Sequence, residues 1–150
     1  LELGELQVRV GSGGVLDIKQ EDVVFEGPSC ELRINAEDPF NFMPSPGLVT
    51  AYHPPGGMGV RVDSHLFADY RMPPHYDSLA GKIIVHAKDR KAAIQRCLRA
   101  LAETHIDGIT TNLELHDFIL RQEAFQSGDI TIHWLEQALE EREAAAGAGT

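Results

Sequence analysis

The stretch that decides the fold spans residues 30–47 and reads CELRINAEDPFNFMPSPG. Its first six residues alternate between an apolar face of Cys, Leu and Ile and a polar face of Glu, Arg and Asn. This period of two predicts a half-buried strand over residues 30–35. The rest of the stretch contains three prolines, and because each removes a backbone donor we expect an irregular loop. Arg33 is therefore expected on the polar face of a strand, just before that loop.

Strand-like segments surround this stretch. Residues 22–27 (DVVFEG) and residues 82–87 (KIIVHA) are typical of strands, the first of them ending at a turn. Residues 47–53 and 59–64 flank the turn sequence Pro-Pro-Gly-Gly, which predicts a hairpin-like connection between them. At the start of the chain, residues 1–10 space their apolar side chains in a way that favours a short helix, although the last of them also fit a strand.

The second half of the chain has helical periodicity instead. Residues 88–105 repeat apolar side chains three and four positions apart, which predicts an amphipathic helix with Asp89 as its N-cap. Thr111 and Glu114 have the spacing of a capping box, so a second helix is expected to begin there and to end before Gly128. Strands first and helices later indicate an α+β fold built on an antiparallel sheet.

Composition and charge exclude several classes of protein. With 150 residues, of which 43% are hydrophobic, the chain is expected to form one soluble globular domain. Its net charge is −10 and its 13 Lys and Arg residues are scattered, so no nucleic-acid-binding surface is expected. No stretch approaches the roughly 18 consecutive apolar residues of a membrane span. Since no secretory signal is evident, Cys30 and Cys97 are expected to be reduced thiols of a cytoplasmic protein.

Local motifs do not assemble a complete active site. The seven histidines lack the spacing of a metal pair, and the glycine-rich turns lack the context of a phosphate-binding loop. Glu31, Glu37 and Asp38 lie near Arg33 in sequence and could act as acid–base groups, but an ordinary ion pair on a strand face is the more common arrangement. From the residues alone, the chain is an α+β domain without a self-contained catalytic centre.

A family resemblance adds to this interpretation. The blocks RINAEDP and FMPSPG resemble the C-terminal domain of biotin carboxylase, the component of acetyl-CoA carboxylase that carboxylates biotin with ATP and bicarbonate. Five further blocks are similar to the family and follow in its order: IKQEDVVFEG (18–27), PPGGMGVRVDSH (54–65), PPHYDSLAGKIIV (73–85), IDGITTN (106–112) and TIHWLE (131–136). The resemblance extends over about residues 1–140 and implies an ATP-dependent ligase.

The resemblance also implies how the chain is divided. Residues 1–14 resemble the end of the ATP-grasp region that precedes this domain in the family, residues 15–140 resemble the domain itself, and residues 141–150 form a low-complexity tail that we expect to be disordered. In the family, the ATP-grasp region carries the Mg²⁺ ligands, the bicarbonate-binding residues and the catalytic base, and their motifs do not occur here. Because Leu1 is not a methionine, we expect a fragment of a longer enzyme that is inactive alone.

The resemblance assigns a catalytic role to Arg33. In the family, ATP activates bicarbonate as carboxyphosphate, which releases carbon dioxide beside biotin. Deprotonation makes the ureido nitrogen of biotin nucleophilic and places negative charge on the ureido oxygen. The family arginine that faces this oxygen falls on Arg33, and a guanidinium suits the task because it stays charged and offers several donors in a rigid fork.

Four further positions carry roles implied by the resemblance. The family places an apolar residue against the adenine of ATP, which falls on Ile132, and His133 stands beside the same pocket. Arg61 matches an arginine of the family's homodimer interface, where Met58 takes the place of a frequent aromatic residue. Without the resemblance, Ile132 would be interpreted as ordinary core and Arg61 as a solvated surface charge.

One block has no assigned role, and one departs from the family. Tyr76 and Asp77 match a block near the biotin side, and their role is left open. Many members read Gly-His-Ala-(Ile/Val)-Glu-Cys before Arg-Ile-Asn, whereas this chain reads GPSCEL. The cysteine is thereby displaced to Cys30, and Leu32 stands next to Arg33. Since the arginine itself is unchanged, we do not expect this departure to affect the activity of the longer enzyme.

The resemblance implies partners and leaves alternatives open. The partners are a second copy in a homodimer, a biotin carboxyl carrier protein and a carboxyltransferase. The blocks RINAEDP, PSPG and YHPPGG resemble the acetyl-CoA carboxylase of fatty acid synthesis more than the alternatives, which are propionyl-CoA, methylcrotonyl-CoA and pyruvate carboxylase. A different alternative is a non-catalytic module for dimerisation or carrier binding, in which Arg33 has no chemical role.

Overall fold

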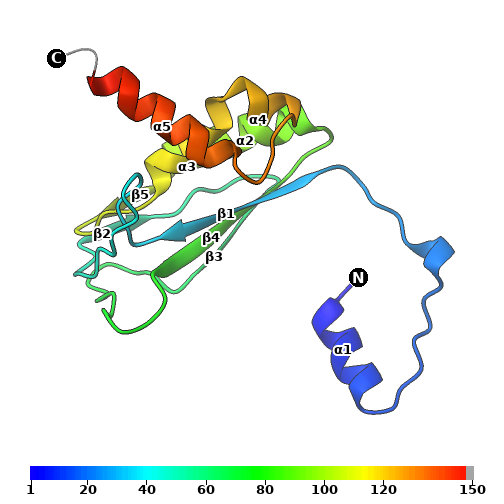
Figure 1. Cartoon of the computed structure of the whole chain (residues 1–150). Coiled ribbons are helices and arrows are strands. Elements are labelled where there is room, and N and C mark those ends of the chain that lie inside the picture. Colours follow the sequence, from blue (N-terminus) through cyan, green and yellow to red (C-terminus); the bar gives the residue numbers. More distant parts are fainter. Residues whose placement is uncertain (148–150) are drawn as a thin grey trace.

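The computed structural model describes residues 1–147 and consists of two antiparallel sheets with helices beside them (Figure 1). The larger sheet has the strand order β1 (Ser29–Asn35), β4 (Leu79–His86), β3 (Val60–Ser64), all antiparallel. The smaller sheet pairs β2 (Ala51–His53) with β5 (His105–Asp107). The predicted α+β class and the predicted strand around Arg33 are therefore confirmed.

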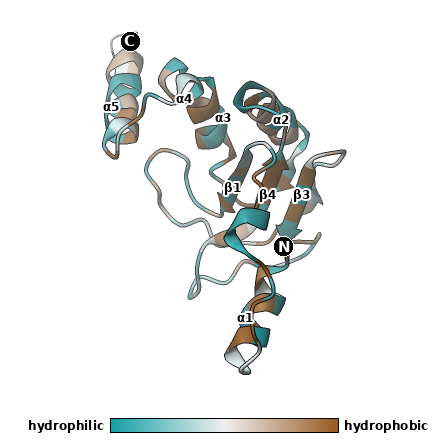
Figure 2. Ribbon diagram, turned by 90° about the vertical axis from the view of Figure 1, so that its right-hand side faces the viewer, coloured by the Kyte–Doolittle hydropathy of each residue, from teal (hydrophilic) through white to brown (hydrophobic). Residues whose placement is uncertain are grey.

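The helices cover one face of the larger sheet. They are α2 (Arg90–Glu103), α3 (Leu113–Arg121) and α4 (Glu123–Ser127), with α5 (Trp134–Gly147) following beyond them (Figure 1). In Figure 2, β4 is largely hydrophobic and lies between β1 and β3, beneath α2. The helices take this face because alternate residues of β1 and β4 direct their apolar side chains toward it. The opposite face, which carries Arg33, is left uncovered by these helices.

Two apolar clusters form the core. The first joins β1, β4, α2 and α3 through Leu32, Ile34, Ile83, Val85, Ile94, Cys97, Ala100, Leu101 and Leu120. The second lies under the loops and consists of Ala36, Val49, Leu66, Met72 and Ala80. Burial of a side chain the size of Leu or Ile contributes roughly 1.5–3 kcal/mol, so the first cluster fixes β1 against the helices.

Both predicted ends of the helical region are confirmed. Asp89 caps α2, since its Oδ1 accepts a hydrogen bond of 2.7 Å from the backbone N–H of Ala92. Gly128 ends α4 with a φ of 87°, a left-handed conformation that favours glycine. The helical prediction for the start of the chain is also confirmed, as α1 spans Leu3–Gly11.

Two strand predictions are wrong. Residues 22–27 form no strand; a short 3-10 turn at Gln20–Asp22 is followed by an extended segment whose Val24 and Phe25 are exposed. The predicted hairpin is also absent, because β2 pairs with β5 and β3 with β4. The loop between them is instead tied to α2, where Arg99 donates to the carbonyl of Gly56.

Two helix predictions are also corrected. The capping box of Thr111 and Glu114 is not formed, because Asn112 occupies the N-cap position of α3. Residues 141–147 were predicted to begin a disordered tail, but they continue α5, whose alanines and glutamates favour a helix. The last part of that predicted tail, residues 148–150, lies outside the described residues.

The segment before β1 stands apart from the sheets. Figure 1 and Figure 2 both show α1 projecting away from the rest of the chain. None of its residues is buried, and Leu3 and Val8 expose their side chains. The expected division at residue 14 remains a prediction.

Candidate functional site

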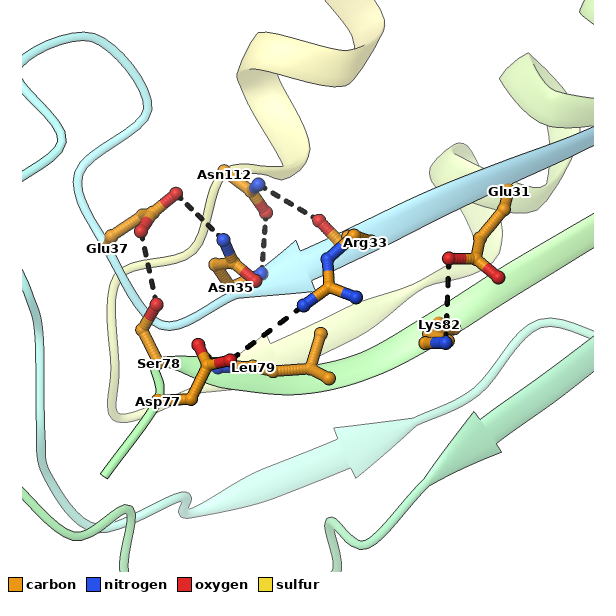
Figure 3. Close-up of polar contacts among 9 residues, drawn as sticks. All are labelled: Glu31, Arg33, Asn35, Glu37, Asp77, Ser78, Leu79, Lys82 and Asn112. Carbon is orange, nitrogen blue, oxygen red and sulfur yellow. Dashed lines mark hydrogen bonds and ion pairs between the residues drawn. The ribbon is translucent and has the colours of Figure 1, made fainter.

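Arg33 stands at the centre of a polar cluster on the uncovered face of the sheet (Figure 3). It pairs directly across β1 and β4 with Lys82. Like charges placed opposite each other destabilise a sheet, and each cation here has a carboxylate beside it. A guanidinium nitrogen of Arg33 lies 3.8 Å from Oδ2 of Asp77, and Nζ of Lys82 lies 3.6 Å from Oε1 of Glu31.

Asp77 orients the guanidinium of Arg33 without engaging its hydrogen-bond donors. Asp77 is itself anchored, because its Oδ1 accepts a hydrogen bond of 3.2 Å from the backbone N–H of Leu79. The 3.8 Å separation between Arg33 and Asp77 is longer than a hydrogen bond. Within residues 1–147 no hydrogen bond uses the guanidinium of Arg33, whose side chain is 50% exposed. Its donors are thus free to meet an anionic ligand.

The backbone of Arg33 is fixed from the other side. Its carbonyl oxygen accepts hydrogen bonds from Nδ2 of Asn112 at 3.0 Å and from Nε2 of His116 at 2.9 Å. Since a carbonyl can only accept, Nε2 of His116 carries the hydrogen. Burial lowers the pKa of His116 below its ordinary value and so favours the neutral imidazole, with its hydrogen on Nε2. The main chain of Arg33 is therefore anchored while its side chain stays available.

The nearby carboxylates are engaged in structural bonds. Both oxygens of Glu37 are used, because Oε1 accepts from Asn35 at 3.1 Å and Oε2 accepts from Ser78 at 3.2 Å (Figure 3). Asp38 accepts the backbone N–H groups of two residues in the loop that follows, and these bonds lower its pKa. The geometry thus favours structural roles for these carboxylates over acid–base chemistry.

The residues expected near ATP lie before α5, on a different element from Arg33. The side chain of Ile132 is 91% exposed, so it does not belong to the core of the chain. Nδ1 of His133 lies 3.5 Å from Oε2 of Glu136 in the first turn of α5. Exposure of Ile132 fits a residue that contacts something outside residues 1–147.

The residues expected at a dimer interface lie at the opposite edge of the sheet from Arg33. Met58 is 92% exposed in the loop before β3. Arg61, on β3, makes a hydrogen-bonded ion pair of 2.8 Å with Asp63. This pair with Asp63 raises the pKa of Arg61 above its usual value, so the group is a permanent surface cation.

Sequence reasoning missed the groups that surround Arg33. Asp77 lay in a recognised block whose role was left open, and Asn112 lay in another such block. Lys82 lay in the same block as Asp77 and in a predicted strand, without a role of its own, and His116 carried no signal. These contacts join segments far apart in the chain, as the separation of 79 positions between Arg33 and Asn112 shows. Periodicity reports a residue's face but not its partner in another element.

The described residues, 1–147, lack two kinds of feature. No group of three or more His, Cys, Asp or Glu residues within 1–147 could hold a metal ion. No helix in the same range has both the length and the apolar character needed to cross a membrane.

Comparisons with known proteins all identify the same family. The model of the biotin carboxylase C-terminal domain matches residues 31–137. Biotin carboxylase of Pseudomonas aeruginosa is 54% identical over 132 residues, which are 88% of this chain and 29% of that protein. Biotin carboxylase of Haemophilus influenzae is 50% identical, covering 93% of this chain and 31% of that protein. The chain thus spans about 30% of the length of these curated relatives.

Solved structures agree. The biotin carboxylase subunit of pyruvate carboxylase has a TM-score of 0.89 at 37% identity, covering 93% of this chain and 31% of that one. The biotin carboxylase domain dimer of Hydrogenobacter thermophilus 2-oxoglutarate carboxylase, in complex with MgADP, ADP and bicarbonate, has a TM-score of 0.87 at 38% identity. It covers 91% of this chain and 30% of that one.

Proposed function

The chain belongs to the biotin carboxylase C-terminal domain family, and we propose that it supplies the biotin-facing arginine of an enzyme that carboxylates biotin with ATP and bicarbonate. The relatives that it matches are biotin carboxylases. Because the chain spans about 30% of their length, we assign the activity to a larger polypeptide that contains this chain.

The observation that carries this proposal is the free guanidinium of Arg33. Its backbone is anchored by two side chains, its position is biased by Asp77, and its donors are uncommitted. When the ureido group of biotin is deprotonated, negative charge develops on its oxygen, and a preorganised cation stabilises that charge as an oxyanion hole does. Removal of one such donor typically costs about 2.7–4 kcal/mol of barrier. A surface arginine serving only stability would gain more from a close ion pair.

In this proposal, the chain contributes some of the residues that bind ATP, and the rest of the polypeptide contributes the others. Ile132 contacts the adenine of ATP, and His133 lies beside it. As the family resemblance implies, the Mg²⁺ ligands and the bicarbonate-binding residues are supplied by another region of the polypeptide. The chain alone is then inactive, and residues 1–14 are the end of the ATP-grasp region.

The proposed assembly is a cytoplasmic homodimer with Met58 and Arg61 at its interface. The 2-oxoglutarate carboxylase relative forms a biotin carboxylase domain dimer. A biotin carboxyl carrier protein brings biotin to Arg33, and a carboxyltransferase uses the carboxylated biotin. On the resemblance of its sequence blocks, we assign the chain to an acetyl-CoA carboxylase. Pyruvate carboxylase remains the second candidate, because its biotin carboxylase subunit is a close structural neighbour.

The test is an assay of the complete polypeptide that contains this chain. With ATP, Mg²⁺, labelled bicarbonate and free biotin, we expect biotin-stimulated ADP release and labelled carboxybiotin, whereas the 150-residue chain alone produces neither. If the complete polypeptide forms no carboxybiotin, the proposed function is wrong. Addition of the carrier protein and carboxyltransferase, with acetyl-CoA or pyruvate as acceptor, separates the two parent enzymes.

A further inference from the structure

We propose that Asn112 is a positioning residue for the reaction: its carboxamide takes the place of a neighbouring strand on the open edge of β1 and so fixes the main chain that carries Arg33. The inference rests on the proposed role of Arg33. It concerns a residue that does not touch biotin and acts only through the arginine.

The geometry is that of a strand partner. β1 is an edge strand, since the order of the sheet is β1-β4-β3. Residues two apart direct their backbone groups to the same edge, and here these are the carbonyl of Arg33 and the N–H of Asn35. Asn112 meets both, donating from Nδ2 to Arg33 at 3.0 Å and accepting at Oδ1 from Asn35 at 2.8 Å. Its backbone N–H adds a third bond, of 3.2 Å, to the carbonyl of Asn35.

The position of these bonds along β1 is informative. The pairing of β1 with β4 shifts its register between Ile34 and Asn35. The extra residue is Ala80 of β4, and a bulge of this kind bends the bulged strand and locally disrupts its ladder with β1. Asn112 bridges this same irregularity from the other edge. The segment that follows Arg33 therefore depends on Asn112, and not on β4 alone, for its conformation.

The helix that follows gives independent support. Asn112 occupies the N-cap position of α3, where an asparagine side chain commonly accepts a hydrogen bond from the first turn. No such bond is formed. Its side chain is instead turned to β1, and the residue is only 5% exposed, which shields both bonds from water. The carboxamide therefore serves the strand and not its own helix.

Only a carboxamide of this length meets both groups. Aspartate keeps the acceptor for Asn35 but cannot donate to the carbonyl of Arg33. Alanine removes both bonds and leaves two backbone groups to find other partners. His116 also donates to the Arg33 carbonyl, so the loss of Asn112 loosens the segment without releasing it fully.

The experiment uses the complete polypeptide and two activities of the same enzyme. Bicarbonate-dependent ATP hydrolysis without biotin does not involve Arg33 in this proposal, whereas carboxylation of biotin does. For Asn112→Asp and Asn112→Ala we expect kcat for biotin carboxylation to fall roughly tenfold to a hundredfold, the range expected for misplacement of a catalytic group. Biotin-independent ATP hydrolysis should stay within about twofold of the unmodified enzyme. Asn112→Asp, which preserves volume, serves alone if the alanine variant does not fold.

Ser64→Ala is the matched control. The hydroxyl of Ser64 also joins two backbone groups, donating to the carbonyl of Ala80 at 2.8 Å and accepting from Leu66 at 3.1 Å, but on β3 instead of β1. We expect this variant to leave both activities within about twofold. In the background of Arg33→Ala, a further change of Asn112 should have no effect on biotin carboxylation, because its contribution passes through the arginine.

The outcomes separate three accounts. A parallel loss of both activities in the Asn112 variants would assign the residue to stability and overturn the inference, as would unchanged biotin carboxylation. Additive effects of Arg33→Ala and Asn112→Ala would also overturn it. If the unmodified enzyme shows no biotin-dependent turnover, the proposed function fails, whatever the variants do.

Discussion

At the level of single residues, the proposed role of Arg33 requires a guanidinium that is oriented by a neighbour and still has donors free for a ligand. Asp77 lies too far from Arg33 for a hydrogen bond and close enough for attraction. The pair is half-exposed, and exposed ion pairs contribute about 0–1 kcal/mol to stability. We therefore expect this ion pair to orient the guanidinium of Arg33 and to have little effect on the free energy of unfolding.

Asp77→Asn tests this expectation. Loss of the carboxylate charge should lower kcat/KM for biotin by roughly fivefold or less, which corresponds to about 1 kcal/mol or less. The melting temperature should hardly change. Asp63→Asn, which removes a comparable partner from Arg61, should leave kcat/KM unchanged. Steady-state kinetics beside thermal denaturation measure both, and a large drop in melting temperature without a kinetic effect would contradict the orienting role.

At the scale of the element, the contact between β1 and α2 brings together the two cysteines. Cys30 lies half-buried on the apolar face of β1 and packs against the cluster that contains buried Cys97 of α2. The neighbouring thiol of Cys97 lowers the pKa of Cys30 to about 7. The Cys30 thiol and burial together raise the pKa of Cys97. The two thiols should thus differ in reactivity.

The pH dependence of alkylation tests this contact. Because the thiolate is the nucleophile, Cys30 should react with iodoacetamide increasingly as pH rises, with a midpoint near 7, while Cys97 stays unmodified. Cys97→Ala removes the neighbouring thiol, so the midpoint of Cys30 should move upward toward or beyond the ordinary thiol value. Mass spectrometry of the alkylated chain gives both rates. An identical midpoint in the two proteins would show that Cys97 has no such effect.

Local pattern predicted some of these elements and not others, for a physical reason. Alternation along β1 and the cap at Asp89 depend on neighbours in sequence, so they were predicted correctly. The hairpin prediction was wrong because β2 pairs with β5 and β3 pairs with β4. Local turn chemistry does not determine such pairing. Likewise, pattern placed Arg33 on the polar face, but its contacts with Asp77 and Asn112 depend on how distant segments fold together.

In the molecule as a whole, two exposed surfaces would be contacted by other parts of the proposed enzyme. Leu3, Val8 and Phe25, in the segment before β1, expose apolar side chains that a neighbouring region would cover. Met58 is exposed at the opposite edge of the sheet from Arg33, beside the cation of Arg61. The proposed biotin-facing arginine and the proposed dimer interface thus lie on different strands, and each can be tested separately.

Arg61→Glu in the complete polypeptide tests the interface. A charge reversal places a second carboxylate beside Asp63, and like charges in an interface are strongly unfavourable. We expect the dimer dissociation constant to rise by more than about tenfold, measured by sedimentation or light scattering over a range of concentrations. Lys91→Glu, the same charge change on an exposed residue of α2, should leave it unaltered. Equal dissociation constants for the two variants would remove Arg61 from the interface.

The proposed stabilisation of charge on biotin by Arg33 can be measured in a single pair of assays. These assays give the rate of biotin carboxylation by the complete polypeptide with Arg33→Ala and, beside it, the rate of its biotin-independent ATP hydrolysis. Loss of a preorganised donor should lower kcat for biotin carboxylation by roughly 10²–10³ and leave ATP hydrolysis without biotin largely intact. Arg33→Lys should carboxylate biotin at a rate between those of Arg33→Ala and the unmodified enzyme, because lysine keeps the charge but lacks the planar fork of donors. Carboxylation of biotin by Arg33→Ala at the unmodified rate would contradict the account.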